Sequence, residues 1–70
     1  MLSKELGDKI KKRRKELKIT QPHLSELAKI SKNTLYKLER GQANPTCDVL
    51  NRLVEVLGLE IVLQVKNLSK

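Results

Sequence analysis

Residues 32–40 carry several side chains that suit hydrogen bonding to nucleic-acid bases. Lys32 and Lys37 can donate to O6 and N7 of guanine, and Asn33 can pair with N6 and N7 of adenine. Two alternatives stay open, because the lysines can be plain solvated charges and Asn33 can make a local turn or cap hydrogen bond. The chemistry that these residues offer is binding through hydrogen bonds and charge.

Residues that usually perform catalysis or hold metals are sparse. His23 and Cys47 each occur once, which excludes an internal disulfide and a zinc site of the Cys/His type. The sequence contains no Ser/His/Asp set, no carboxylate pair beside a base and no glycine-rich phosphate loop. It therefore predicts a protein that is not an enzyme, with no metal, no cofactor and no small-molecule substrate. We expect His23 to lie on the surface and Cys47 to be inert.

The positive charge is large and unevenly distributed. Lysine and arginine number 15 against 8 acidic residues, which gives a net charge of +7. The first forty residues hold twelve basic and five acidic side chains, and the last thirty hold three of each, so the first forty carry the whole net charge. This distribution favours an anionic partner, with nucleic acid as the first candidate and an acidic membrane surface as the second. A merely solvated face is the remaining alternative.

The chain is 70 residues long, which allows one domain with a small core. A core of this size supplies only about 3–5 kcal/mol, and without a disulfide or metal the expected supplement is a second chain. No run of about 18 apolar residues occurs, and the first residues contain no apolar signal segment. We therefore expect a cytoplasmic protein with no membrane partner.

Apolar periodicity predicts an all-α fold of four helices, with a short fifth helix as an alternative for the last segment. The first helix is expected over residues 4–17 and the third over residues 32–40. Thr20, Ser31 and Thr46 are the expected N-caps of the second, third and fourth helices. The expected inward faces consist of Leu6, Ile10 and Leu17; Leu24, Leu27 and Ala28; Leu35 and Leu38; and Val49, Leu50, Leu53, Val54 and Leu57.

Residues 59–66 have a different period. Their apolar members alternate with other residues, a pattern typical of a β-strand. A lone amphipathic strand is not stable, and residues 1–58 offer no second strand, so we expect residues 59–66 to pair with a second copy about a two-fold axis. A frayed tail is the alternative. The apolar row that would hold this homodimer together consists of Leu59, Ile61, Leu63 and Val65.

Two short helices joined by three or four residues, the second exposing polar side chains, are typical of a helix-turn-helix unit. Residues 6–59 resemble the Cro/CI-type (XRE) helix-turn-helix domain, and the resemblance implies that residues 1–58 bind double-stranded DNA. The recurrent features of the family occur in order as Arg14, Thr20-Gln21, Leu24, Ala28, Ser31, Thr34-Leu35, Glu39-x-Gly41, Pro45 and Leu57-Gly58.

The resemblance assigns roles to matching positions. Lys32, Asn33 and Lys37 occupy the positions that read base edges in this family. Helix N-termini attract phosphate because their backbone N–H groups are free. For Tyr36 an alternative stays open, in which its ring covers the second helix. Contacts to the DNA backbone are implied for Gln21, Thr34, Tyr36 and Arg40.

The resemblance also implies an internal ion pair between Arg14 and Glu39, which would join the first helix to the third.

Four positions depart from the family pattern. Lysines replace two turn glycines, and a non-glycine residue in the left-handed conformation costs about 1–2 kcal/mol. The four departures are Arg13, Lys18, Ser25 and Lys29.

The last segment narrows the resemblance. Residues 59–66 are similar to the C-terminal strand of HipB-type antitoxins, which are small helix-turn-helix dimers. This implies a repressor that binds an inverted-repeat operator of its own operon and binds a HipA-type kinase toxin. A Cro-type phage repressor is one alternative, and an interaction module without specific DNA binding is another.

Overall fold

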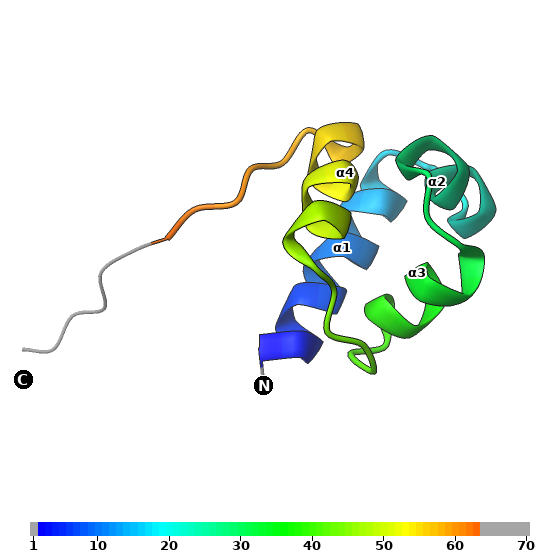
Figure 1. The fold of residues 1–70 in the computed structure, drawn as a ribbon. Helices are drawn as coiled ribbons and strands as arrows, with labels where there is room; N and C mark the ends of the chain where they lie inside the picture. The colour runs from blue at the N-terminus through cyan, green and yellow to red at the C-terminus, as the bar shows by residue number, and fades with distance from the viewer. Residues whose placement is uncertain (1, 64–70) are drawn as a thin grey trace, which may run out of the picture.

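The computed structural model describes residues 2–63, which form a bundle of four α-helices (Figure 1). α1 packs against α3 and α4, and α2 also packs against α3 and α4. The predicted all-α architecture is therefore confirmed for the described residues, which contain no fifth helix. The helices are α1 Leu2–Glu16, α2 Gln21–Ala28, α3 Lys32–Glu39 and α4 Cys47–Leu57.

Side-chain hydroxyls define where three of the helices begin. Each hydroxyl oxygen accepts a hydrogen bond from the backbone N–H of the residue three positions later. The distances are 3.2, 2.9 and 3.1 Å for Thr20, Ser31 and Thr46. Each of these groups satisfies a backbone donor that a helix start leaves unpaired, as the sequence predicted. Three predicted bounds differ slightly. α1 begins at Leu2 and ends at Glu16, where residues 4 and 17 were predicted. α3 ends at Glu39, with Arg40 as the C-cap, where residue 40 was predicted.

Two lysines adopt the left-handed backbone conformation that favours glycine. Lys18 has φ 58° and Lys29 has φ 59°, at the two turns where lysine stands in place of a family glycine. The Lys29 carbonyl accepts a hydrogen bond from Nη1 of Arg52, on α4, at 3.1 Å. The turn between α2 and α3 therefore takes a glycine-type conformation without a glycine, and α4 supports it.

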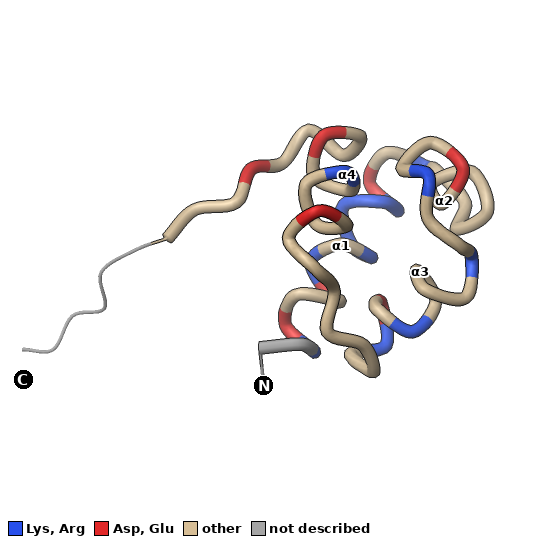
Figure 2. The backbone as a smooth tube through the Cα atoms, viewed as in Figure 1, with Lys and Arg blue, Asp and Glu red and all other residues tan. Residues whose placement is uncertain are grey.

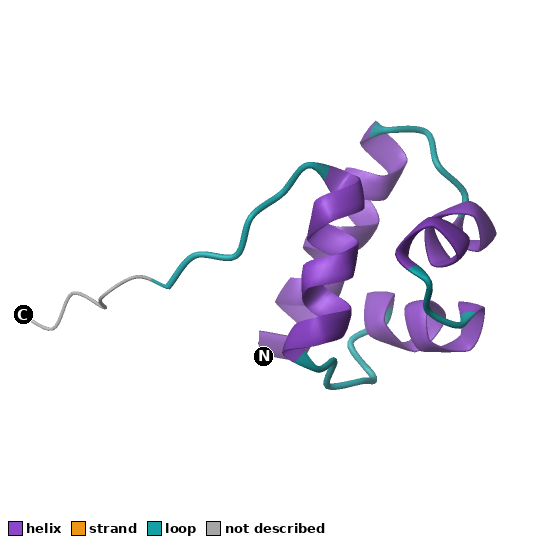
Figure 3. Ribbon diagram, turned by 45° about the horizontal axis from the view of Figure 1, so that its top comes forward, coloured by secondary structure: helices purple, strands orange, loops and turns teal. Residues whose placement is uncertain are grey.

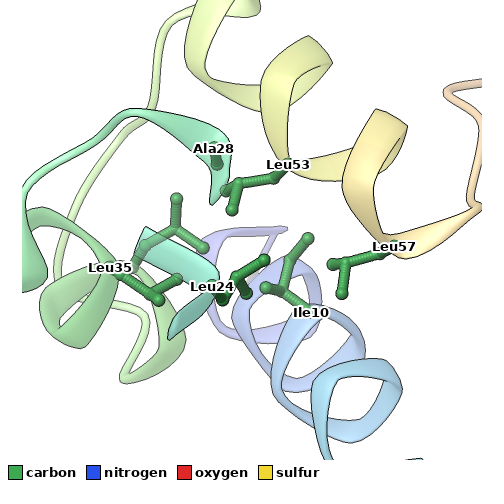
Figure 4. Close-up of a cluster of buried hydrophobic side chains, with 7 residues drawn as sticks. Ile10, Leu24, Ala28, Leu35, Leu53 and Leu57 are labelled. Carbon is green, nitrogen blue, oxygen red and sulfur yellow. The ribbon is translucent and has the colours of Figure 1, made fainter. Parts of the chain in front are cut away.

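Seven apolar side chains from all four helices form the core (Figure 4). Each is 2% exposed or less, so the four helices share one continuous apolar interior. Removing such side chains from water is the main contribution to the stability of a small domain. The core consists of Ile10, Leu24, Ala28, Leu35, Leu38, Leu53 and Leu57.

Two predicted core residues are exposed instead. Leu17 is 39% exposed because α1 ends one residue before it, so the apolar stripe of that helix does not continue. Leu27 is 48% exposed because α2 buries the face that contains Leu24, Ser25 and Ala28, which leaves Leu27 at its edge. Ser25, which stands where the family has alanine, donates its hydroxyl to the Pro22 carbonyl at 2.8 Å.

Gly7 allows a close approach between α1 and α3 that the sequence pattern did not reveal. Gly7 is buried, and a Cβ atom at this position would collide with the carbonyl oxygen of Leu38. It would also lie 3.0 Å from the carbonyl oxygen of Glu39. The absence of a side chain at Gly7 therefore sets how closely α1 packs against the C-terminal end of α3.

Arg13 stands where the family usually has an apolar residue, and it closes the end of another helix. Its Nε donates to the Leu57 carbonyl at 2.8 Å, at the C-terminus of α4. Its Nη1 also lies 3.3 Å from the Glu16 carboxylate. A cation at a helix C-terminus stabilises the carbonyls that lack partners there, so Arg13 joins α1 to α4 by charge and hydrogen bonding.

The predicted C-terminal strand is not formed by the described residues. Residues 59–63 run away from the bundle as a loop (Figure 3), and residues 64–66, including Val65, lie outside the described part. A strand requires hydrogen bonds to a neighbouring strand, and residues 2–63 of a single chain contain none. Leu59, Ile61 and Leu63 are consequently 38%, 51% and 97% exposed.

Among the described helices, none is long and apolar enough to cross a membrane.

Candidate nucleic-acid interface

One face of α3 gathers the polar residues that the sequence singled out. Leu35, Leu38 and Glu39 point into the bundle, where α1 and α2 cover them. A helix has 3.6 residues per turn, so residues at positions 32, 33, 36, 37 and 40 fall on the side opposite these buried residues. The residues at these positions are all exposed, and they are Lys32, Asn33, Tyr36, Lys37 and Arg40.

Basic residues are concentrated in residues 1–40, the part of the chain that contains the first three helices. Lysine and arginine recur along α1, at the turn before α3 and along α3 itself, and both α1 and α4 also carry acidic residues (Figure 2). On α1, the exposed lysines line a shallow surface with Asp8 and Glu16. The lysines of that surface are Lys11, Lys12 and Lys15.

The start of α3 is fixed by a reciprocal pair. Ser31 Oγ accepts the Thr34 N–H at 2.9 Å and lies 2.8 Å from the Thr34 hydroxyl oxygen, to which it donates. Ser31 therefore fills the cap position, and Asn33 is exposed beside it. The Thr34 hydroxyl accepts from Ser31, and a hydroxyl that accepts can still donate its own hydrogen.

Arg14 and Glu39 form a buried, two-pronged ion pair between α1 and α3. Arg14 Nε and Nη2 lie 2.7 and 3.0 Å from the two carboxylate oxygens of Glu39. Nη1 of Arg14 donates to the Ile19 carbonyl at 2.8 Å. The Glu39 side chain is 1% exposed and that of Arg14 is 10% exposed. The pair thus fixes the C-terminal end of α3 against α1 and the turn that precedes α2.

Gln21 joins this network from the start of α2. Its Nε2 donates to Oε1 of Glu39 at 2.9 Å, so the carboxylate receives donors from two helices. The amide nitrogen carries a second hydrogen, which the geometry leaves for another acceptor. Within the described residues, every fully buried side-chain nitrogen or oxygen has a hydrogen-bond partner. The polar network therefore sets the relative position of α2 and α3, the two helices of the helix-turn-helix unit.

Tyr36 and Arg40 interact with each other on the exposed side of α3. The guanidinium carbon of Arg40 lies 5.3 Å from the centroid of the Tyr36 ring, which is within cation–π range. Tyr36 is 48% exposed, so it does not belong to the core. The family resemblance implied a DNA-backbone contact for each residue but did not indicate that the two side chains contact each other.

No grouping of three or more His, Cys, Asp or Glu side chains that could hold a metal ion occurs in residues 2–63. Cys47 is exposed at the start of α4, and His23 is exposed on α2.

The model of the helix-turn-helix family matches residues 10–64, which include α2, α3 and the turn between them. The chain belongs to the helix-turn-helix family. This agrees with the XRE-type resemblance seen in the sequence, whereas the narrower HipB-type resemblance has no counterpart in the match.

Three relatives illustrate the range of this family. A protein of Methanococcus maripaludis strain C5, named an HTH-type transcriptional regulatory protein, is 32% identical over 56 residues, which are 80% of this chain and 17% of that protein. The immunity repressor protein of Bacillus phage phi105 is 38% identical over 56 residues, 80% of this chain and 39% of the repressor. An uncharacterised HTH-type regulator of Methanothermobacter thermautotrophicus is 35% identical over 51 residues, 73% of this chain and 74% of the relative. The chain therefore spans less than two thirds of the first two relatives.

Solved structures share the arrangement of the helices. The clp gene regulator ClgR of Corynebacterium glutamicum has a TM-score of 0.83 and 26% identity, covering 87% of this chain and 78% of that one. The restriction-modification controller protein C.AhdI of Aeromonas hydrophila has a TM-score of 0.78 and 23% identity, covering 81% of this chain and 86% of that one. The latter likeness concerns the fold alone.

Proposed function

We propose that this protein is a sequence-specific DNA-binding regulator of transcription, acting as a repressor and not as an enzyme. The observation that carries the proposal is the exposed face of α3, where Lys32, Asn33 and Lys37 project while Leu35 and Leu38 are buried behind them. A helix held in this way can enter the major groove and present its first residues to base edges. The relatives named as transcriptional regulators and as an immunity repressor support the same function.

The contacts divide into two kinds. Lys32, Asn33 and Lys37 would read bases through the donors and acceptors of the major groove. The residues around them would position the protein on phosphates, which fixes its register but carries no sequence information. Gln21 is suited to this role because its amide is already oriented by Glu39. The remaining proposed phosphate contacts are Thr34 and Arg40.

We further propose a homodimer on an inverted-repeat operator. α1, α4 and residues 59–63 line a groove, and its apolar wall includes Leu6, Leu50 and Val54. The exposed Ile61 and Leu63 continue this apolar surface beyond the bundle. A second copy would remove both from water and could supply the missing neighbour for a strand.

The narrower role of a HipB-type antitoxin with a HipA-type kinase toxin as partner rests on the resemblance of residues 59–66 alone. A phage-type repressor has support of a different kind, because the phi105 immunity repressor is 38% identical over the helix-turn-helix region. Both roles share the proposed DNA-binding surface, so the same binding experiment tests their common part.

The test is selection of duplexes from a random DNA pool by the wild-type protein. We expect enrichment of an inverted repeat that binds about a thousandfold or more tightly than a scrambled duplex at equal salt concentration. A control variant carries alanine at Lys32, Asn33 and Lys37, whose exposure predicts an intact fold. It should lose the enrichment and retain weak, salt-dependent binding. Equal affinity of the wild type for all duplexes would overturn specific DNA binding.

A further inference from the structure

Tyr36 and Arg40 lie one turn apart on α3, and their contact has no structural role in the core. The Arg40 guanidinium carbon lies 5.3 Å from the ring centroid. Tyr36 is 48% exposed and Arg40 is also exposed, so the pair is on the same side of α3 as Lys37. Tyr36 is the only aromatic residue of the chain, so the cation–π contact is a specific feature of this site.

We propose that Tyr36 is a positioning residue whose ring holds the Arg40 guanidinium ready for a DNA phosphate. In this view Tyr36 acts through Arg40 and its own hydroxyl makes no contact with the DNA. The inference rests on the proposed DNA-binding function and deepens it, because it separates the roles of two residues that the family resemblance places together on the DNA backbone.

The position of Arg40 explains why such support is useful. Arg40 is the C-cap of α3, and its backbone N–H is bonded back to carbonyls of the last turn. The C-terminus of a helix carries partial negative charge, which disfavours a phosphate and attracts a flexible cation back toward the helix end. A ring face one turn earlier holds the guanidinium on the exposed side of α3. Less conformational freedom is then lost when the guanidinium meets a phosphate.

Two roles of Tyr36 give different results in a salt series. A neutral hydroxyl that donates to a phosphate releases no counterion, so its loss lowers affinity without changing the salt slope. If the Tyr36 ring instead positions Arg40, loss of the ring leaves Arg40 misplaced and its phosphate poorly neutralised. The affinity then falls and the salt slope flattens. Tyr36→Phe separates the two further, because it removes the hydroxyl and keeps the ring face.

The experiment measures the affinity of the full chain for its selected duplex at several salt concentrations. The variants are Tyr36→Phe, Tyr36→Leu, Arg40→Gln and the Tyr36→Leu/Arg40→Gln double variant. We expect Tyr36→Phe to bind like the wild type and Tyr36→Leu to lose about two- to fivefold per half-site, the range for an exposed cation–π contact. Arg40→Gln should flatten the slope by about 0.9 per half-site, and Tyr36→Leu should change it in the same direction. In the Arg40→Gln background, Tyr36→Leu should have no further effect.

Two results would overturn the inference. One is an equal loss for Tyr36→Phe and Tyr36→Leu with an unchanged slope, which indicates direct contact by the hydroxyl. The other is the same loss for Tyr36→Leu whether or not Arg40 is present. Wild-type protein that binds no duplex specifically would instead overturn the proposed function.

A measurement on the protein without DNA separates failure of the Tyr36–Arg40 inference from failure of the proposed DNA-binding function. The ring current of Tyr36 should shift the Arg40 side-chain NMR signals upfield in the wild type and in Tyr36→Phe. The shift should vanish in Tyr36→Leu, while the thermal midpoint of all variants stays close to that of the wild type because both residues are exposed. Arg40 signals that are identical in the wild type and Tyr36→Leu would show that the contact does not form in solution.

Discussion

Asn33 and Lys12 are both exposed polar residues, but they lie on different helices and should affect DNA binding differently. Asn33 is in the first turn of α3, where it can reach a base edge. Lys12 is on α1, away from α3 in the sequence, and any contact that it makes with DNA should be to phosphate. We expect Asn33→Ala to cost about 1–3 kcal/mol on the selected duplex and to relax the preference at one base position per half-site.

Lys12→Ala is the matched control for this prediction. It should weaken binding to selected and scrambled duplexes alike and flatten the salt slope by about 0.9 per half-site if Lys12 neutralises a phosphate. Competition binding on selected, single-base-variant and scrambled duplexes distinguishes the two patterns. Equal losses on selected and scrambled DNA for Asn33→Ala would mean that this side chain does not read a base.

Glu39 is the residue whose loss should most disturb the fold. Glu39→Ala leaves the Arg14 guanidinium buried without its carboxylate and removes the acceptor of Gln21. Breaking one side of a buried pair costs about 3–5 kcal/mol. The control is Asp48→Ala, which breaks the exposed Arg52–Asp48 pair and should cost at most about 1 kcal/mol. Urea unfolding measures both, and a Glu39→Ala midpoint no lower than that of Asp48→Ala would contradict the prediction.

The turn between α2 and α3 is strained at one position, and the strain can be removed. Lys29 has φ 59°, so Lys29→Gly should raise the free energy of unfolding by about 1 kcal/mol. The Arg52 hydrogen bond should remain because it uses the Lys29 backbone carbonyl. The same change in the interior of α1, Lys12→Gly, should lower the free energy of unfolding by about 1 kcal/mol.

Lys29→Gly and Lys12→Gly both replace a lysine by glycine and so remove the same charge. Opposite changes in the free energy of unfolding would therefore report the backbone conformation at each position. Denaturant midpoints at unchanged m-values provide the measurement. A loss of stability in Lys29→Gly would be incompatible with a left-handed residue in this turn. At the level of elements, the helix-turn-helix unit is therefore expected to tolerate strain because α4 and the Glu39 network hold it from both sides.

The proposed homodimer belongs to the scale of the whole molecule. Ile61→Lys places a charge in the exposed apolar row of residues 59–63 and should convert dimers into monomers. Asn51→Lys, at an exposed position of α4, is the control and should leave the association state unchanged. Sedimentation equilibrium over a concentration series measures both. A wild type that stays monomeric at roughly tens of micromolar would contradict the dimer, because association follows mass action.

Dimerisation also predicts the form of the operator. Two copies related by a two-fold axis require two inverted half-sites about one helical turn, or 34–36 Å, apart. Ile61→Lys should therefore bind a single half-site as the wild type does but lose the gain in affinity on the complete operator. An undiminished gain would show that residues 59–63 do not hold the two copies together.

The sequence alone predicted four helices, the starts of α2, α3 and α4, and most of the core. These features depend on local chemistry: a hydroxyl such as that of Ser31 caps the helix that follows it, and leucines such as Leu35 and Leu38 repeat at helical spacing. The exposed side of α3 follows from the same spacing, since burial of one face leaves the other to solvent. Local patterns could not place Leu17 or Leu27, because their exposure depends on where a helix ends and how wide a face its neighbours cover.

Only the tertiary structure decided which distant groups meet. The approach of Gly7 to α3, the bond from Arg13 to the end of α4 and the position of Gln21 on Glu39 each join residues far apart in the chain. No period or cap encodes such contacts, because they depend on the distances between packed helices. The same reason applies to residues 59–63, whose alternation suits a strand although strand formation requires hydrogen bonds from a neighbour that residues 2–63 do not supply.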